Sequence, residues 1–306
     1  MSEEMIRLVN TVLVPGGLMA IMFSLGLTLT LADFGRLFEQ PRAVLAGLTG
    51  HFLCLPVLGV AIAGLFRLPP EMAMGIFILS VSPAGVTSNA VTFAARGNVA
   101  LAVVLTTVTS LVTIVTTPLL IQWGLSHYFG GGDAPDISVL KTMRQLLFMT
   151  ALPILSGMVV RRLWQELAQR LVVWLRPTSL IILLAVIVFS VVVSVDLLLQ
   201  NLVRAGPAAW MLNVAAMITG LLIARLFGLE RADMMTVGIE VGVQNATMAT
   251  FLSLAILNNW AMAITPTLYG CIMVVNAGLM VRLIKLYWHR QDARAAASRL
   301  APRRQP

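Results

Sequence analysis

Long apolar segments follow one another along almost the whole chain, and they constrain its fold more than any other feature. Each is about 20 or more residues long, the length that an α-helix needs to cross a bilayer. The chain is 58% hydrophobic and only 11% charged, so a soluble domain made from it would expose large apolar surfaces. The runs are continuous and do not alternate as barrel strands do. We therefore predict an all-α polytopic membrane protein.

We predict nine transmembrane helices, which together form a single transmembrane domain over residues 1–286. The predicted spans are 9–31, 43–65, 72–95, 98–124, 138–160, 178–199, 207–226, 234–256 and 260–282. A basic tail, residues 287–306, follows them. We expect this tail to be a disordered segment that fixes the topology, and binding to anionic lipid is the alternative.

The basic residues indicate the orientation. An odd number of spans places the two termini on opposite sides of the membrane. With the C-terminus inside, sixteen of the 21 Lys and Arg residues lie in inner loops and the tail, as the positive-inside rule requires. We therefore expect an outer N-terminus and a cytoplasmic C-terminus, in a bacterial cytoplasmic (inner) membrane. The net charge of +8 is then explained by topology, without a nucleic-acid partner.

The eighth predicted span carries a carboxylate, Glu240, with the carboxamides Gln244 and Asn245 close by. At 1.5 Å per residue, Glu240 lies about 9 Å inside the near end of the span. A charged side chain at the centre of a membrane helix costs roughly 2.5–3.5 kcal/mol on insertion scales, so it marks a functional site. Gly238 and Gly242 loosen the same segment.

The third and eighth spans resemble each other. Ser88-Asn-Ala90 corresponds to Gln244-Asn-Ala246, and each span is interrupted, by Ser82-Pro-Ala-Gly85 in one and by Gly238 and Gly242 in the other. By the predicted topology they cross in opposite directions, as inverted repeats do, and paired broken helices indicate the central binding site of a transporter. A simple kink at Pro83 is the alternative.

Two interrupted helices that meet in the membrane would offer helix N-termini to an anion and freed carbonyls to a small cation. The side chains nearby are mostly oxygen donors, which a hard cation prefers: Ser88, Asn89, Thr106, Thr107, Glu240, Gln244 and Asn245. We expect Thr116 and Thr117 to bond only to their own helix. The sequence carries no catalytic constellation and no His/Cys metal motif, so we predict neither an enzyme nor an organic cofactor.

These segments resemble the two signatures of the bile acid:sodium symporter family. Ser82–Asn89, followed by Ala95–Leu101 and Thr106-Thr107, is similar to one, and Glu240-Val-Gly-Val-Gln-Asn245 to the other. Bacterial members often have ten helices, and this chain is expected to lack the first. The resemblance implies a panel domain (parts of 9–65 and 178–226) against a core domain (72–160 and 234–282), with two broken helices crossing in the core. It also implies sodium-coupled import of a small organic anion by alternating access.

The resemblance also implies the residues of the sites. One sodium site would use Ser88, Asn89, Thr106 and Glu240, and the other Glu240, Gln244 and the carbonyls of Val241 and Val243. The substrate would contact Asn245 and the backbone of Gly85, Val86 and Thr87.

Two positions depart from the family pattern: Ala102 replaces a serine of the first site and His51 a glutamine of the second. Neutral imidazole binds sodium poorly and imidazolium would repel it, but a histidine can change charge near neutral pH. We hypothesise a proton relay between His51 and Glu240 in place of the second cation. A hydrogen-bonded histidine without a transport role is the alternative.

The sequence thus predicts a secondary active transporter whose partners are sodium, a small organic anion and the bilayer. A proton-coupled or sodium-independent transporter or exporter of the same superfamily is the first alternative. A passive anion channel, or a receptor that binds anions without moving them, is the second.

Overall fold

The computed structural model describes residues 9–130, 137–175, 181, 188 and 195–300, and this part of the chain is almost entirely helical. In chain order the elements, with η for π-helical segments, are η1 (Val9–Leu13), α2 (Val14–Gly26), α3 (Leu31–Glu39), α4 (Pro41–Thr49), η2 (Gly50–Cys54), α5 (Leu55–Leu65), α6 (Pro70–Ser80), α7 (Thr87–Ala95), α8 (Val99–Phe129), α9 (Val139–Leu146), η3 (Leu147–Ala151), α10 (Leu152–Leu163), α12 (Val195–Leu226), α13 (Arg231–Gly242), α14 (Ala246–Phe251), η4 (Leu252–Ile256) and α15 (Trp260–Leu300).

Five helical stretches in the described residues are long and apolar enough to cross a bilayer: Pro41–Leu65, Val99–Phe129, Val139–Leu163, Asn201–Leu226 and Trp260–Asp292. A sixth is added if the bent pair Thr11–Gly26 and Leu31–Glu39 forms one span. Many large apolar side chains on these helices are exposed, such as Val57 at 62% and Val275 at 72%, as a lipid-facing surface requires. The protein is therefore an integral membrane protein.

The predicted total of nine helices stays a prediction. The third and eighth predicted spans are each divided between two shorter helices. Most of the sixth, 178–199, lies outside the described residues.

The first predicted span, 9–31, ends earlier than expected. α2 ends at Gly26, and the pair Thr11–Gly26 and Leu31–Glu39 is bent by 81°. Asp33 Oδ2 accepts hydrogen bonds from the Thr30 amide at 2.8 Å and from the Thr30 hydroxyl at 2.7 Å. The bond from the Thr30 amide to the side chain three residues later is one half of a capping box, which stabilises the start of a helix, so a new helix begins at Leu31, the last residue of the predicted span.

Three prolines follow π-helical turns and do not break the helical stretches that contain them. Pro15, Pro56 and Pro153 each stand in the first turn of an α-helix that directly follows a π-helical segment. Proline lacks an N–H and clashes with the carbonyl four residues earlier, so the preceding turn is displaced. The second and fifth predicted spans remain single helical stretches for this reason.

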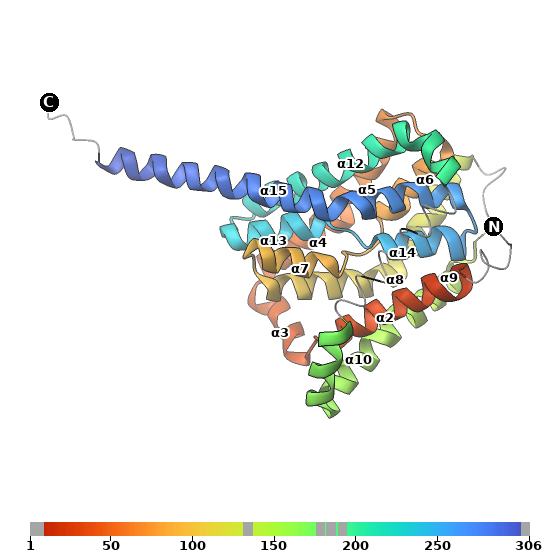
Figure 1. The fold of residues 1–306 in the computed structure, drawn as a ribbon, viewed down its shortest axis with the longest axis horizontal. Coiled ribbons are helices and arrows are strands. Elements are labelled where there is room, and N and C mark those ends of the chain that lie inside the picture. Colours follow the sequence, from red (N-terminus) through yellow and green to blue (C-terminus); the bar gives the residue numbers. More distant parts are fainter. Residues whose placement is uncertain (1–8, 131–136, 176–180, 182–187, 189–194, 301–306) are drawn as a thin grey trace.

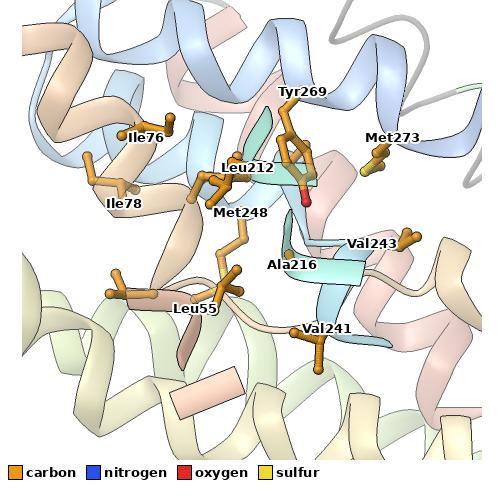
Figure 2. Close-up of a cluster of buried hydrophobic side chains, with 14 of the residues drawn as sticks. Leu55, Ile76, Ile78, Leu212, Ala216, Val241, Val243, Met248, Tyr269 and Met273 are labelled. Carbon is orange, nitrogen blue, oxygen red and sulfur yellow. The ribbon is translucent and has the colours of Figure 1, made fainter. Parts of the chain in front are cut away.

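The helices pack in two groups. Figure 1 shows α2, α3 and α10 on one side and α5, α6, α12 and α15 on the other. Within the first group, α2 and α10 approach closely at Gly26 and Gly157, since a Cβ on Gly157 would lie 2.8 Å from the Leu27 amide nitrogen. In the second, buried apolar side chains of α5, α6, α12, α13, α14 and α15 form the core shown in Figure 2. Small residues permit such close packing of membrane helices.

The last helix continues far beyond the bundle (Figure 1). α15 extends to Leu300, so the expectation of a disordered tail was wrong for residues 287–300. Near the bundle this extension contacts α13: Arg231 pairs with both carboxylate oxygens of Asp292 at 2.7 and 2.8 Å and lies over the Trp288 ring.

Candidate functional site

The third predicted span is interrupted between α6 and α7. Residues 81–86, which include Pro83, are not helical, and Ala84 among them forms an isolated β-bridge. Side chains from other elements bond to the freed main chain: Thr117 Oγ1 donates to the Val81 carbonyl at 2.5 Å and His51 Nε2 to the Ser82 carbonyl at 2.8 Å. The chain therefore unwinds at Pro83, and the alternative of a simple kink is wrong.

The eighth predicted span is interrupted between α13 and α14. Helix α13 ends at Gly242, and Asn245 caps α14 by accepting the Met248 amide on Oδ1 at 3.0 Å. Gly238 does not contribute to this break, contrary to the prediction, because it lies inside α13. Its role is packing: a Cβ there would lie 2.8 Å from the Leu221 side chain of α12.

The two interruptions, residues 81–86 (the first break) and 243–245 (the second break), cross and bond to each other. The Gly85 amide donates to the Val243 carbonyl at 2.8 Å, and the Asn245 amide to the Pro83 carbonyl at 2.9 Å. Ala84 and Gln244 thereby form an isolated antiparallel bridge. Main-chain groups that lipid would leave unsatisfied are paired in this way.

Next to this crossing lies a buried carboxylate, Glu240, which is 2% exposed. The Ser88 hydroxyl donates to its Oε1, and the Thr106 hydroxyl donates to its Oε2 at 2.9 Å. The Ser88 and Thr106 hydroxyl oxygens are 3.4 Å apart. The family resemblance implied that these three residues share a cation site, and in the structure their side chains are in contact. Thr107, however, bonds to the Val103 carbonyl of its own helix at 2.6 Å.

A cavity of about 690 Å³ lies against the crossing. All four residues predicted to bind substrate line it, and so do Asn89 and Gln244. Buried polar atoms without a hydrogen-bond partner in the described structure include the hydroxyl of Thr87, Oδ1 of Asn89, Oε1 of Gln244 and Nδ2 of Asn245. Such atoms are costly to bury alone, so they mark a place for polar ligands.

The charges around the cavity are few. No lysine, arginine or histidine is among its described lining residues, and the single carboxylate there belongs to Asp33. The rest of the wall comes mainly from apolar side chains such as Ile21, Leu25, Phe93 and Met273.

Some of the remaining predicted ligand groups already form hydrogen bonds within the protein. Gln244 Nε2 donates to the Val241 carbonyl at 2.7 Å, and the Val243 carbonyl accepts the Gly85 amide. A carbonyl oxygen has two lone pairs, so each keeps one for a further partner. Asn89 lines the cavity, and its Oδ1 has no hydrogen-bond partner in the described structure. The recorded hydrogen bond of the His51 side chain goes to Ser82, not to Glu240.

Several side chains that hold the breaks were not predicted from the sequence. Thr117 was expected to bond to its own helix and instead reaches the first break, because that break frees the Val81 carbonyl; Thr116 does bond to Val112 of its own helix, at 3.3 Å. Asn213 and Tyr269 both donate to the Gly242 carbonyl, at 2.7 and 2.5 Å. A carboxamide within the apolar span 207–226 was the available signal for Asn213.

A sequence model of the Sodium Bile acid symporter family matches residues 15–201, a range that contains the first break, Ser88 and Thr106. The chain belongs to this family. It is 30% identical over 239 residues to an uncharacterized sodium-dependent transporter of Bacillus subtilis, covering 77% of this chain and 71% of the relative. It is 27% identical to a probable sodium/metabolite cotransporter of Arabidopsis thaliana chloroplasts, covering 78% and 58%. It is also 27% identical to human sodium/bile acid cotransporter 4, covering 92% and 66%.

These relatives are named as transporters, and the family is one of symporters. The protein is therefore a membrane transport protein and not an enzyme. The chain spans less than two thirds of the length of the chloroplast and human relatives.

Proposed function

We propose that this family member is a secondary active transporter that imports a small organic anion together with sodium by alternating access. The observation that carries the proposal is the meeting of two helix breaks beside a buried carboxylate, Glu240, and a cavity with unpartnered polar atoms. Broken helices that meet in the membrane are the common basis of ion-coupled binding sites.

In this proposal sodium binds at Glu240. The first site consists of Ser88, Asn89, Thr106 and Glu240, all of which offer oxygen, the ligand atom that hard cations prefer. The contacts of Ser88 and Thr106 with Glu240 support it. Ala102 is fully buried and offers no oxygen, so this site has one ligand fewer than the family pattern. The second site consists of Glu240, Gln244 and the carbonyls of Val241 and Val243.

The anion binds in the cavity against Asn245, Thr87 and the backbone of Gly85 and Val86. Support comes from the unpartnered Nδ2 of Asn245 and hydroxyl of Thr87. Because no cationic side chain is among the described lining residues, the positive charge that balances the substrate is that of sodium. The dependence of anion binding on bound sodium provides the coupling, since a cation can shift a transporter between states only if it binds them with different affinity.

The wider architecture is part of the same proposal. Nine helices arranged as inverted repeats would form a panel that moves against a core, with an outer N-terminus and a cytoplasmic C-terminus in a bacterial cytoplasmic membrane. The close packing of α2 on α10, apart from α12 and α15, supports two groups of helices. In this proposal α10 belongs with α2 in the panel, whereas the range predicted for the core, 72–160, included it.

Proton coupling is the second candidate, and one observation favours it. His51 is 2% exposed and bonds to the first break at Ser82, so a change in its protonation would act on the substrate site. A sodium-independent exporter or a passive channel has no comparable support.

Thermal unfolding of the purified protein tests the proposal. Small carboxylates and sulfonates are screened in sodium chloride and in choline chloride, and each stabilising compound is then assayed for uptake into proteoliposomes. A ligand that binds only the folded protein raises its stability, so we expect the substrate to stabilise only when sodium is present.

Glu240→Gln removes the charge and keeps the shape. We expect this variant to fold but to lose both sodium-dependent stabilisation and sodium-driven uptake. Glu166→Gln, at an exposed glutamate of the residue 164–175 segment, is the matched control. Full sodium-driven uptake by Glu240→Gln would refute the assigned sodium sites, and uptake that never exceeds equilibrium in the wild type would indicate a channel.

A further inference from the structure

The carbonyl oxygen of Gly242 receives two side-chain donors from two different helices. Asn213 Nδ2 on α12 donates to it at 2.7 Å, and the Tyr269 hydroxyl on α15 at 2.5 Å. In an unbroken helix this carbonyl would accept the amide four residues later, but α13 ends here and the Ala246 amide bonds to the Gln244 carbonyl. The two side chains thus replace the helical bond that the second break removes.

Close packing of α12 against α13 brings Asn213 within reach. Gly220 of α12 faces α13 so tightly that a Cβ would lie 2.8 Å from the Val237 carbonyl oxygen and 3.0 Å from Gly238 Cα. A glycine pair of this kind lets two helix backbones approach. Tyr269 reaches the same carbonyl from α15, and Figure 2 shows its side chain pointing from α15 toward Ala216. Asn213 and Tyr269 are both fully buried.

The position of Gly242 makes this contact relevant to binding. The next three residues are the second break: the carbonyl of Val243 bonds to the first break, and Gln244 and Asn245 line the cavity. A rotation of the Gly242–Val243 peptide would therefore move the groups proposed to bind sodium and substrate. Buried carbonyls are expensive to leave unpaired, so two donors on one oxygen fix this peptide firmly.

We propose that Asn213 and Tyr269 are positioning residues that hold the second break in its binding geometry, and that they set the affinity for the coupling ion without touching it. The inference depends on the proposed sodium-coupled function. With both donors present, the ion meets a preorganised site. Without them, part of its binding free energy is spent on ordering the break, and its apparent affinity falls.

Sodium dependence of uptake in three variants tests the proposal: Tyr269→Phe, Asn213→Leu and the double variant. Because the two donors share one acceptor, either can satisfy the carbonyl alone. We expect each single change to raise the sodium KM by about 3-fold, and the double change by about 30-fold or more, beyond the product of the single effects. The maximal rate per folded protein should stay within about 2-fold.

Tyr128→Phe is the matched control, because the Tyr128 hydroxyl has no hydrogen-bond partner in the described structure, and its sodium KM should not change. A double variant with an unchanged sodium KM and a reduced maximal rate would overturn the proposal, since the two residues would then serve only folding. Single effects that simply multiply would also contradict the shared acceptor.

Hydrogen exchange covers the case in which the double variant does not fold. In Tyr269→Phe without sodium, the amides of residues 243–248 should exchange faster than in the wild type and in Tyr128→Phe, and added sodium should restore protection. Equal exchange in the three proteins would overturn the proposal. If the wild type shows no sodium-dependent uptake, the proposed function fails, and the exchange result still decides whether the two residues hold the break.

Discussion

The backbone amide of Gly85 donates a hydrogen bond to the carbonyl oxygen of Val243 at 2.8 Å, although the two residues lie in helix breaks from different halves of the chain. A second bond, from the Asn245 amide to the Pro83 carbonyl at 2.9 Å, lies beside it. The two breaks therefore satisfy each other's main-chain groups. Since neither can move far alone, a ligand bound to one break also acts on the other.

Gly85→Ala should disrupt this crossing. A Cβ at this position would lie 2.7 Å from the Gln244 carbonyl oxygen and 3.0 Å from its carbon, and both are main-chain atoms that cannot rotate away. Overpacking of this kind costs about 1–3 kcal/mol, so we expect uptake to fall by about 10-fold or more as the breaks separate. Initial uptake rates in proteoliposomes, normalised to folded protein, measure the effect.

Gly64→Ala is the control for this variant. Gly64 lies in the apolar helix α5, and a Cβ there would meet nothing within 4 Å. Its uptake should match the wild type. Wild-type uptake by Gly85→Ala would contradict the tight crossing of the breaks.

Thr106 and Thr107 form a natural pair for testing the proposed cation site. Thr106 donates to Glu240, whereas its neighbour donates to its own helix. Thr106→Val removes an oxygen ligand and a charge-assisted hydrogen bond, which contributes about 1.5–3 kcal/mol, so the sodium KM should rise by about 10-fold or more. Thr107→Val should change it by less than about 2-fold. Equal sodium dependence in the two variants would remove Thr106 from the site.

Sequence patterns predicted the features that depend on local chemistry. A buried acid, Glu240, and a proline, Pro83, are each unusual inside an apolar span, so the location of the site and of the first break followed from them. The likeness of two segments indicated that the broken helices meet, and the resemblance to the symporter family implied that Ser88 and Glu240 share a site.

Other features depend on contacts between distant helices, which no local pattern encodes. Thr117 is followed by proline and looks like a residue that bonds only to its own helix. Its bond to Val81 exists because the first break frees a carbonyl beside it. Gly238 was predicted to interrupt the eighth span. The sequence cannot distinguish a glycine that loosens a helix from one that lets a neighbouring helix pack closely. Only the packing of Leu221 against it distinguishes them.

His51→Gln tests the proton hypothesis. The imidazole bonds to the Ser82 carbonyl at the first break, and glutamine keeps a donor for that bond while it cannot titrate. If His51 carries a proton during transport, a pH gradient without sodium should drive uptake in the wild type and not in the variant, whose sodium dependence should become steeper. Uptake is measured with each gradient imposed separately. Identical responses of the two proteins would refute a proton relay and leave His51 as a support of the break.

Gly157→Ala tests the packing of α2 on α10, the pair assigned to the panel. A Cβ on Gly157 would lie 2.8 Å from the Leu27 amide nitrogen and 2.9 Å from the Gly26 carbonyl carbon, so the two backbones must separate. The separation would also strain the bond from Arg161 Nη1 to the Leu27 carbonyl, now 3.1 Å long. We expect a loss of about 1–3 kcal/mol in stability and a lower Tm, measured by thermal unfolding in nanodiscs. Gly16→Ala, on the same α2 with nothing within 4 Å of the added Cβ, should leave the Tm unchanged. Equal Tm values for the two variants would show that α2 and α10 do not depend on glycine for their contact.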